Sequence, residues 1–488
     1  MLRFCRNEEF MHFTKRIMAV LLVAALTAGL YAGSFIDWDS EDAQENPLAF
    51  LNQKETIRVW YGDEALTDYI SRAAVAFGDA HNVRVLPYYI AESDYLETIN
   101  RVTLNGGEET PSMPDAYLIS HDLLEKAYLA GLAVPVEDVA GVMDAAHFPK
   151  AALSAVTYHG KLVAYPLYYE TSALIYNETY LYEWARQQAG KADPTGGIDG
   201  EEGEFEELDE LPDDEDSLVI YDEETLALRT QQFFERAIPA TVGDILQIAD
   251  SFDPPETVEG IFSWDVSDIF YNYYFVGNYM NLGGEAGDDR SQIDIYNQEA
   301  IASLGIYQGL NQFFSIDSST VSYDSVLQDF LEGKLVFTIA TTDAAAVLAQ
   351  AKEEGNFPYD YGVSLMPDPS GELAGRSMSV TSAVAINGYS EHQELANAFA
   401  AYLADGYAEN LYEQTGKVSA NRTVNRSNGA LQIFLAEYED SMPLPKLMEA
   451  SNYWTWLEVL FAKVWNGEDV SSMVEQLDQQ MRTQLVKN

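Results

Sequence analysis

One extended, aromatic-rich stretch constrains the fold more than any other part of the chain: residues 158–181 read YHGKLVAYPLYYETSALIYNETYL. A turn at His159 opens the stretch, and Asn177, a good helix N-cap, closes it. Pro166 interrupts the apolar run, and a proline suits a bend between strands better than the middle of a central strand. We therefore expect the segments on either side of Pro166 to belong to different sheets, so that the stretch crosses between two globular bodies.

A carboxylate lies in the middle of this stretch. Glu170 stands between Tyr169 and Thr171. Strands that cross between two bodies form the floor of a cleft, where ligand sites concentrate. Glu170 is therefore the first candidate ligand-binding residue.

Length and charge narrow the class of protein. The chain has 488 residues, enough for two or three domains, and its 47% hydrophobic and 12% aromatic residues rule out general disorder. The formal net charge of -52 repels phosphate backbones and anionic membrane surfaces. Nucleic acid is therefore not expected as a partner.

The N-terminal region carries an export signal. Residues 17–36 form an apolar run of membrane length without a charge, directly after two basic residues. We expect residues 1–36 to be a signal peptide or an uncleaved membrane anchor, and residues 37–54 to be a linker. The only cysteine, Cys5, precedes the run, so neither a lipid at its end nor a disulfide in the exported body is expected. The chain should lie at the outer face of the cytoplasmic membrane, secreted or anchored, and contact the membrane only through this segment.

Strand and helix signals alternate from residue 56 onward. Strand patterns at 57–60, 83–89 and 114–119 each precede an amphipathic pattern, at 66–77, 94–104 and 122–129. This alternation predicts a mostly parallel sheet with helices on both faces, and ligands gather beyond the carboxyl ends of such strands.

The polar residues after these strand ends are candidates for a site. They are Asp63 and Glu64 after the first strand and Asp122 after the third. Capping of the following helix is an equal alternative for Asp122 and a weaker one for Asp63. His121 is not expected to bind a metal, because no second ligand accompanies it at a suitable spacing.

An acidic segment interrupts the pattern at residues 191–216. It contains turn formers followed by a nearly unbroken acidic run, too charged to pack, and it lacks the spacing of a calcium-binding loop. We expect a disordered surface insertion that folding and binding do not need.

Local signals place the remaining elements. They are a capping box at Thr241 and Asp244, an aromatic-rich helix over 269–280, a helix and strand over 325–339, a second crossing strand over 379–387, and a helix opened by a capping box at Ser390 and Gln393.

Several of these motifs resemble one family. The run GKLVAYP at 160–166 with Tyr176-Asn177 is similar to the hinge of the maltose-binding-protein family, the extracytoplasmic sugar-binding components of ABC importers. The segment 325–339 resembles a second family motif, and the aromatic tail 453–469 resembles the family's C-terminal end. The resemblance covers about residues 57–485 outside the acidic insertion.

The resemblance implies a fold and its division. The expected fold is α/β, a two-lobed periplasmic-binding-protein-like fold of type II, in which crossing strands join two lobes. Lobe 1 would comprise residues 55–169 and 379–430. Lobe 2 would comprise residues 170–378 and 431–488, with the acidic insertion within it.

The resemblance also implies a set of ligand-binding residues. Asp63 and Asp122 match two family aspartates, whereas Glu64 stands where the family example has Lys and Asp343 where it has a stacking Trp. The remaining candidates are Glu170 at the hinge, Tyr273 or Tyr274 on the aromatic helix, and Trp454 at the position of a stacking tryptophan, with Trp60 or Trp264 as further aromatic surfaces. Core packing is the alternative for these aromatic residues.

The chemistry expected of such a cleft is recognition of a sugar. Aromatic rings stack on the C–H face of a pyranose, and carboxylates accept hydrogen bonds from its hydroxyl groups. The resemblance thus implies a monomeric protein that captures a carbohydrate, an oligosaccharide, for ABC permease subunits, with no catalytic residue, cofactor or metal. An anchored glycosidase, which also needs paired carboxylates, and an adhesion or scaffold protein are the alternatives.

Overall fold

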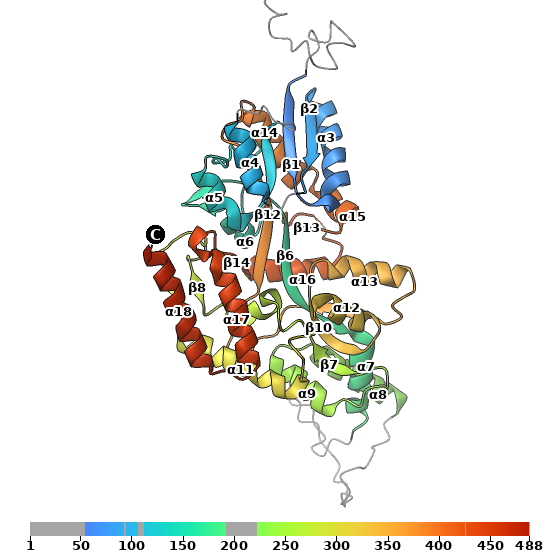
Figure 1. Cartoon of the computed structure of the whole chain (residues 1–488). Coiled ribbons are helices and arrows are strands. Elements are labelled where there is room, and N and C mark those ends of the chain that lie inside the picture. Colours follow the sequence, from blue (N-terminus) through green and yellow to red (C-terminus); the bar gives the residue numbers. More distant parts are fainter. Residues whose placement is uncertain (1–53, 92–93, 106–111, 192–221, 425, 488) are drawn as a thin grey trace, which may run out of the picture. The chain divides into compact units, whose positions relative to one another are not determined.

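The computed structural model describes residues 54–91, 94–105, 112–191, 222–424 and 426–487 (Figure 1). The predicted export segment, nearly all of the linker and the acidic insertion from residue 192 onward lie outside these ranges. The described residues divide into two compact units: those within 57–77 and 85–487 belong to one, and residues 54–56 and 78–84 belong to the other. All the residues that line the candidate site belong to the larger unit.

One mixed sheet organises the fold. Its strands follow the order β2-β1-β3-β12-β6-β10-β7. Parallel pairs lie toward its ends, β1 with β3 and β7 with β10, whereas the strands around β6 and β12 pair antiparallel. The bounds are β1 Thr56–Tyr61, β2 Arg84–Tyr89, β3 Ala116–Ser120, β6 Tyr165–Asn177, β7 Gly260–Ser263, β10 Leu335–Thr341 and β12 Met378–Ile386.

Strand β6 connects the two halves of this sheet. Its first half pairs with β12 and with β13 (Val418–Ser419), and its second half pairs with β10 and with β11 (Tyr361–Ser364). Figure 1 shows β6 and β12 side by side along the middle of the sheet. A further short strand, β14 (Met442–Pro443), pairs with β12.

The expected break at Pro166 is wrong, because β6 runs through this proline without interruption. The register of β12 shifts between Ser382 and Ala383, opposite the proline, and such an irregularity accommodates a residue that has no N–H to donate. The turn at His159 is confirmed. It joins β4 (Thr157–Tyr158) to β5 (Lys161–Leu162), a hairpin separate from β6.

Helices follow most of the strands, as the alternation predicts. Asn177 caps α7 by accepting the Tyr180 N–H, and the predicted capping box of Thr241 and Asp244 opens α9. None of the described helices is long and apolar enough to cross a membrane. The helices are α3 Thr67–His81, α4 Tyr95–Leu104, α5 Leu124–Leu129, α6 Lys150–Ala155, α7 Glu178–Ala189, α8 Glu223–Arg236, α9 Val242–Ser251, α10 Ile269–Asn272, α11 Gln298–Phe314, α12 Tyr323–Leu331, α13 Ala344–Glu353, α14 Gln393–Ala401, α15 Leu411–Thr415, α16 Gly429–Asp440, α17 Tyr453–Trp465 and α18 Val470–Lys487.

Two helix predictions need correction. The aromatic helix expected over 269–280 is only α10 with a short 3-10 turn, η4 (Tyr273–Phe275), because the aromatic side chains of this segment are buried on more than one side of the chain. The capping box expected at Ser390 and Gln393 does not form. Ser390 instead donates its hydroxyl hydrogen to Asp115 Oδ1 at 2.6 Å, and α14 begins without a side-chain cap.

Aromatic residues fill the core beside α11 and α17. The Trp264 and Trp465 rings meet edge to face at 5.5 Å, and Tyr307 packs against Phe461 at 5.0 Å. The indole N–H of Trp264 donates to Asn272 Oδ1 at 2.8 Å. Trp264 and Trp60 are both fully buried, so they belong to the core.

Candidate ligand-binding site

A hollow of about 510 Å³ lies beside β6 and β12, within the size range of small-molecule sites. Four of its lining residues are aromatic, three are carboxylates and one is a lysine. The lining comprises Glu170, Asp268, Ile269, Phe270, Tyr271, Tyr323, Thr341, Asp343, Met378, Val380, Lys417, Leu444 and Trp454. Polar and aromatic groups are therefore presented to the same space.

Lys417 holds two carboxylates together at one side of the hollow. Because β13 pairs antiparallel with β6, the residue just before β13 falls opposite Glu170. This residue is Lys417. The Lys417 Nζ lies 3.2 Å from Asp63 Oδ2, 3.4 Å from Glu170 Oε1 and 5.2 Å from the centre of the Tyr168 ring. Burial acts to lower the pKa of Lys417, but Tyr168 and the two carboxylates outweigh burial and raise it. Lys417 is therefore a cation at neutral pH.

Asp63 has two roles in the structure. Its Oδ1 accepts the Ala65 N–H at 3.0 Å and so caps the 3-10 turn η2 (Glu64–Leu66), while its Oδ2 pairs with Lys417. Asp63 thus fulfils the capping alternative, and it also contacts Lys417, which lines the hollow. Glu64, the first residue of the turn, is exposed and does not line the hollow.

Asp122 does not line the hollow and does not cap a helix. It lies in the 3-10 turn η3 (His121–Leu123), which has no side-chain cap, and accepts a hydrogen bond from the Ser120 hydroxyl. Burial raises the pKa of Asp122 above its usual range. Asp122 therefore does not share the hollow with Glu170, although the resemblance implies that both bind the ligand.

His121 joins three segments of the backbone. Its Nδ1 accepts the Thr381 N–H at 3.0 Å, so Nε2 carries the hydrogen and donates to the Leu444 carbonyl at 3.1 Å. Burial lowers the pKa of His121 to about 3, so the ring is neutral at physiological pH. This residue fixes the end of β3 to β12 and to Leu444, which lines the hollow.

The aromatic side of the hollow is built from α10 and α12. The Tyr271 and Tyr323 rings stack at 5.1 Å with an angle of 12° between them. The Tyr323 hydroxyl donates to Asp343 Oδ1 at 2.9 Å, and Thr341 also hydrogen-bonds this carboxylate. Asp268 caps α10 through the Phe270 N–H at 2.8 Å and so fixes the start of the helix.

The structure places the predicted aromatic residues unequally. Trp454, at the start of α17, is partly buried and lines the hollow. Tyr273 and Tyr274 are buried in the core, where the Tyr273 ring packs 5.8 Å from that of Trp454. The aromatic pair that reaches the hollow is Phe270 and Tyr271, one turn earlier.

Of the predicted residues, the structure thus brings three to the lining, Glu170, Asp343 and Trp454, and links Asp63 to it through Lys417. Sequence reasoning missed Lys417, Tyr271 and Tyr323. The short polar turn before the Val418 strand could have drawn attention to Lys417, but nothing local connects it with a carboxylate 247 residues away. Among the described residues no cluster of three or more potential metal-binding side chains occurs.

The chain is similar to a known family of proteins. Residues 72–432 match the family described as bacterial extracellular solute-binding protein. The maltodextrin-binding protein MdxE of Bacillus subtilis (strain 168) is 23% identical over 470 residues, which cover 93% of this chain and 93% of that protein.

Solved structures of low sequence identity share the fold. An extracellular solute-binding protein from Staphylococcus aureus in complex with maltose superposes with a TM-score of 0.67 at 17% identity, over 89% of this chain and 99% of that one. A cyclo/maltodextrin-binding protein complexed with maltotetraose gives 0.66 at 17% identity, over 88% and 97%. The predicted periplasmic-binding-protein-like α/β fold is confirmed.

Proposed function

The chain belongs to the bacterial extracellular solute-binding proteins, and from this we propose that it captures an oligosaccharide of the maltodextrin type and delivers it to the permease subunits of an ABC importer. The proposed site is the hollow beside β6 and β12. The comparisons give no support to the glycosidase alternative, and the proposal includes no catalytic step.

One observation carries the proposal: a single hollow presents both the groups that stack on a sugar and the groups that bind its hydroxyls. Trp454 and Tyr323, both partly exposed, offer flat apolar faces for the C–H side of a pyranose, and the buried Tyr271 ring stacks against Tyr323 and supports it. Glu170 accepts hydrogen bonds from hydroxyl groups, and the Lys417 ammonium donates them. A neutral polyhydroxylated ring satisfies both sets at once.

The organisation of the protein around this site is part of the same proposal. Residues 55–169 and 379–430 would form one lobe, and residues 170–378 and 431–488 the other. The strands β6 and β12 would cross between the two lobes, and they contribute Glu170 and Val380 to the lining of the hollow. Closure of the lobes over the sugar would create the surface that the permease reads. The protein would act as a monomer at the outer face of the cytoplasmic membrane, held there or released according to the fate of residues 1–36.

A ligand panel tests the assignment. Maltose, maltotriose and maltotetraose are compared with cellotriose, xylotriose, amino acids and short peptides by thermal shift and calorimetry. A ligand at 100 times its Kd stabilises the folded protein by about 2.7 kcal/mol, so a matching oligosaccharide should raise the melting temperature measurably. Absence of both a shift and a heat with every carbohydrate would remove the sugar assignment.

Glu170→Gln is expected to weaken oligosaccharide binding by roughly 1 to 3 kcal/mol, because the amide keeps the shape and loses the charge that strengthens hydroxyl hydrogen bonds. Its effect on the free energy of unfolding should stay below about 1 kcal/mol, since Glu170 and Lys417 are both partly exposed. Calorimetry and urea denaturation measure the two effects separately.

Glu285→Gln is the matched control for this change, because Glu285 pairs with Lys150 at 2.8 Å on the surface. A purely structural role of Glu170 would show the opposite pattern, a loss of stability with normal affinity. The partner in that case would be Lys417. Lys161, the other lysine near this stretch in the sequence, is exposed and donates to the Tyr128 hydroxyl at 3.3 Å instead.

A further inference from the structure

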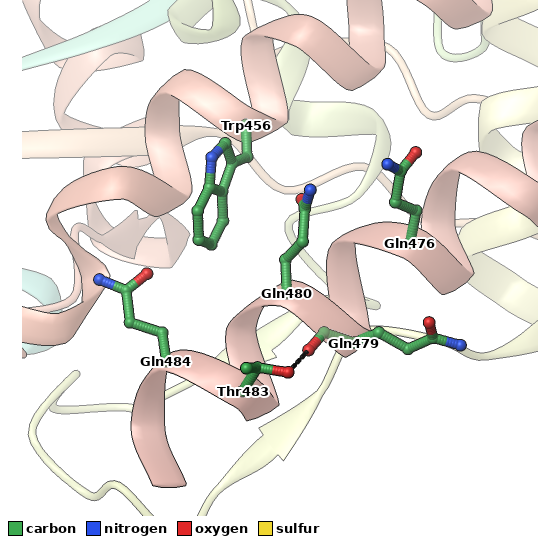
Figure 2. A pocket seen from close by; sticks show the side chains of 6 residues that line it. All are labelled: Trp456, Gln476, Gln479, Gln480, Thr483 and Gln484. Atoms are coloured by element: carbon green, nitrogen blue, oxygen red, sulfur yellow. Dashed lines mark hydrogen bonds between the residues drawn. The ribbon is translucent and has the colours of Figure 1, made fainter. Parts of the chain in front are cut away.

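A second hollow, a groove of about 530 Å³, lies between α17 and α18. Figure 2 shows the Trp456 ring projecting from α17 toward α18, where the side chains of Gln480 and Gln484 rise toward it. All the other lining residues come from α18. The lining comprises Trp456, Gln476, Gln479, Gln480, Thr483 and Gln484.

The glutamines form a continuous polar stripe. Gln476, Gln480 and Gln484 follow one another at intervals of four residues, so they share one face of α18 over about 12 Å. The buried side-chain oxygen of Gln484 has no hydrogen-bond partner within the described part of the chain. Gln476 and Gln480 likewise make no side-chain hydrogen bond to any residue that the structure describes. The Gln476 and Gln480 amides are thus available to a molecule in the groove, and the Gln484 oxygen is buried without a partner beside them.

The charge of the lining restricts the class of that molecule. The whole chain carries a net charge of -52, and yet none of the six lining residues is charged. The lining offers no ion pair to a charged molecule, whereas a neutral polar molecule can use all of its hydrogen-bonding groups, so a neutral molecule fits better. Glutamine amides both donate and accept hydrogen bonds, as hydroxyl groups require, and an indole ring stacks on the C–H face of a sugar.

This groove is separate from the hollow beside β6. Trp454 and Trp456 lie two residues apart on α17, which turns 100° per residue, so their side chains leave the helix about 200° apart. Trp454 lines the hollow beside β6, and Trp456 lines the groove on the other side of the helix. One helix therefore contributes a partly buried tryptophan to each of two hollows.

We propose that the groove between α17 and α18 is a second carbohydrate site, which binds a short neutral oligosaccharide segment through Trp456 and the glutamine stripe of Gln476, Gln480 and Gln484. The lining of the groove supports this site independently of the function proposed for the hollow. A flat, open groove with one indole predicts weaker binding than the hollow, which has several aromatic faces.

Fluorine NMR of the full chain labelled with 5-fluorotryptophan tests the proposal, because the chain has 7 tryptophans and Trp456→Phe assigns the relevant signal. The probes are maltoheptaose and cellohexaose. At least one of them should shift the Trp456 signal in the wild type and equally in Trp454→Ala. Gln480→Leu, which keeps a good helix former, should reduce the association constant measured at Trp456 about tenfold.

Gln350→Leu is the control for the glutamine change, since Gln350 is exposed on α13 and its amide bonds Glu354 at 2.8 Å. It should leave the Trp456 titration unchanged. No shift at Trp456 with either probe would overturn the proposal, and so would a dimer in sedimentation that Trp456→Phe abolishes, because the groove would then bind a second copy. A response at Trp456 with a silent Trp454 would leave this proposal intact and remove the one for the hollow.

Discussion

Gly277→Ala is expected to lower the free energy of unfolding by about 3 kcal/mol, at the upper end of the cost of overpacking. A Cβ at this position would overlap the carbonyl oxygen of Arg376 and approach its carbonyl carbon to 3.0 Å. The Arg376 N–H donates to the Tyr274 carbonyl at 3.0 Å, so the Arg376 backbone cannot move away without weakening this bond. Urea denaturation followed by circular dichroism measures the change.

Gly305→Ala is the matched control and should act in the opposite direction. Gly305 is exposed within α11, and an added Cβ meets no atom within 4 Å. Alanine should therefore stabilise the helix by up to about 1 kcal/mol. If Gly277→Ala stayed within 1 kcal/mol of the wild type, the tight contact between residues 277 and 376 would not be a rigid feature of the fold.

The position of Gly277 also bears on the site. Gly277 follows Tyr271 closely in the sequence, and Arg376, which it contacts, closely precedes Met378; Tyr271 and Met378 both line the hollow. A shift of the Arg376 backbone would move the start of β12 relative to α10. Gly277→Ala should therefore weaken maltotetraose binding as well, whereas Gly305→Ala should not.

The sequence predicts the individual strands and helices of this fold better than it predicts which strands pair with each other. Period-two and period-3.6 patterns depend on neighbouring residues, and they locate strands such as β1 and β3 and helices such as α3 to within a few residues. The path of β6 depends on the register of β12, more than 200 residues later, and the irregularity at Ser382 that admits Pro166 leaves no mark on the local sequence. The long-range pairing with β12 lets β6 continue through Pro166, which the local rule for proline does not predict.

The candidate site shows the same division. Glu170 and Trp454 could be placed because each belongs to a motif with its own pattern. Tyr271 and Tyr273 both belong to one aromatic segment, and only the cap at Asp268, which fixes where α10 starts, decides which ring reaches the hollow. Lys417 meets Glu170 solely because β13 joins β6, so the ion pair is a property of the tertiary fold.

Arg290→Leu is expected to destabilise the protein by about 3 kcal/mol, because it leaves buried carboxylates without their cation. Arg290 Nη2 lies 3.1 Å from Glu449 Oε1 and 3.5 Å from Glu125 Oε1. The two glutamate side chains are only 4% and 2% exposed, whereas that of Arg290 is 47% exposed. Because the Arg290 side chain is half-exposed, the expected loss of stability lies at the low end of the range for breaking a buried ion pair.

The two glutamates do not depend on Arg290 equally. Glu125 also accepts hydrogen bonds from the Tyr158 hydroxyl at 3.1 Å and from the Met448 N–H at 2.5 Å. The other oxygen of Glu449, Oε2, is buried and has no partner among the residues that the structure describes. Glu449→Gln should therefore recover more than half of the stability lost in Arg290→Leu, and the double-mutant cycle should give a coupling energy above about 1 kcal/mol.

Lys150→Leu serves as the control, because Lys150 and Glu285 form an ion pair at 2.8 Å in which both side chains are 68% exposed. Removal of this surface pair should change the free energy of unfolding by less than about 1 kcal/mol. Urea denaturation of the four variants at pH 7 makes the comparison. An equal effect of the Arg290 and Lys150 changes, or no recovery by Glu449→Gln, would show that Arg290 does not hold the buried charges.

The ion pairs of Arg290 also connect stability with binding. Glu125 holds the Met448 N–H, and this segment runs from Leu444, which lines the hollow, to Trp454 on α17. If the buried pair fixes the segment, Arg290→Leu should raise the Kd for maltotetraose about tenfold even under conditions where the variant is fully folded. Lys150→Leu should leave the Kd unchanged, since its ion pair involves no residue of the lining. A normal Kd in Arg290→Leu would confine the role of this cluster to stability.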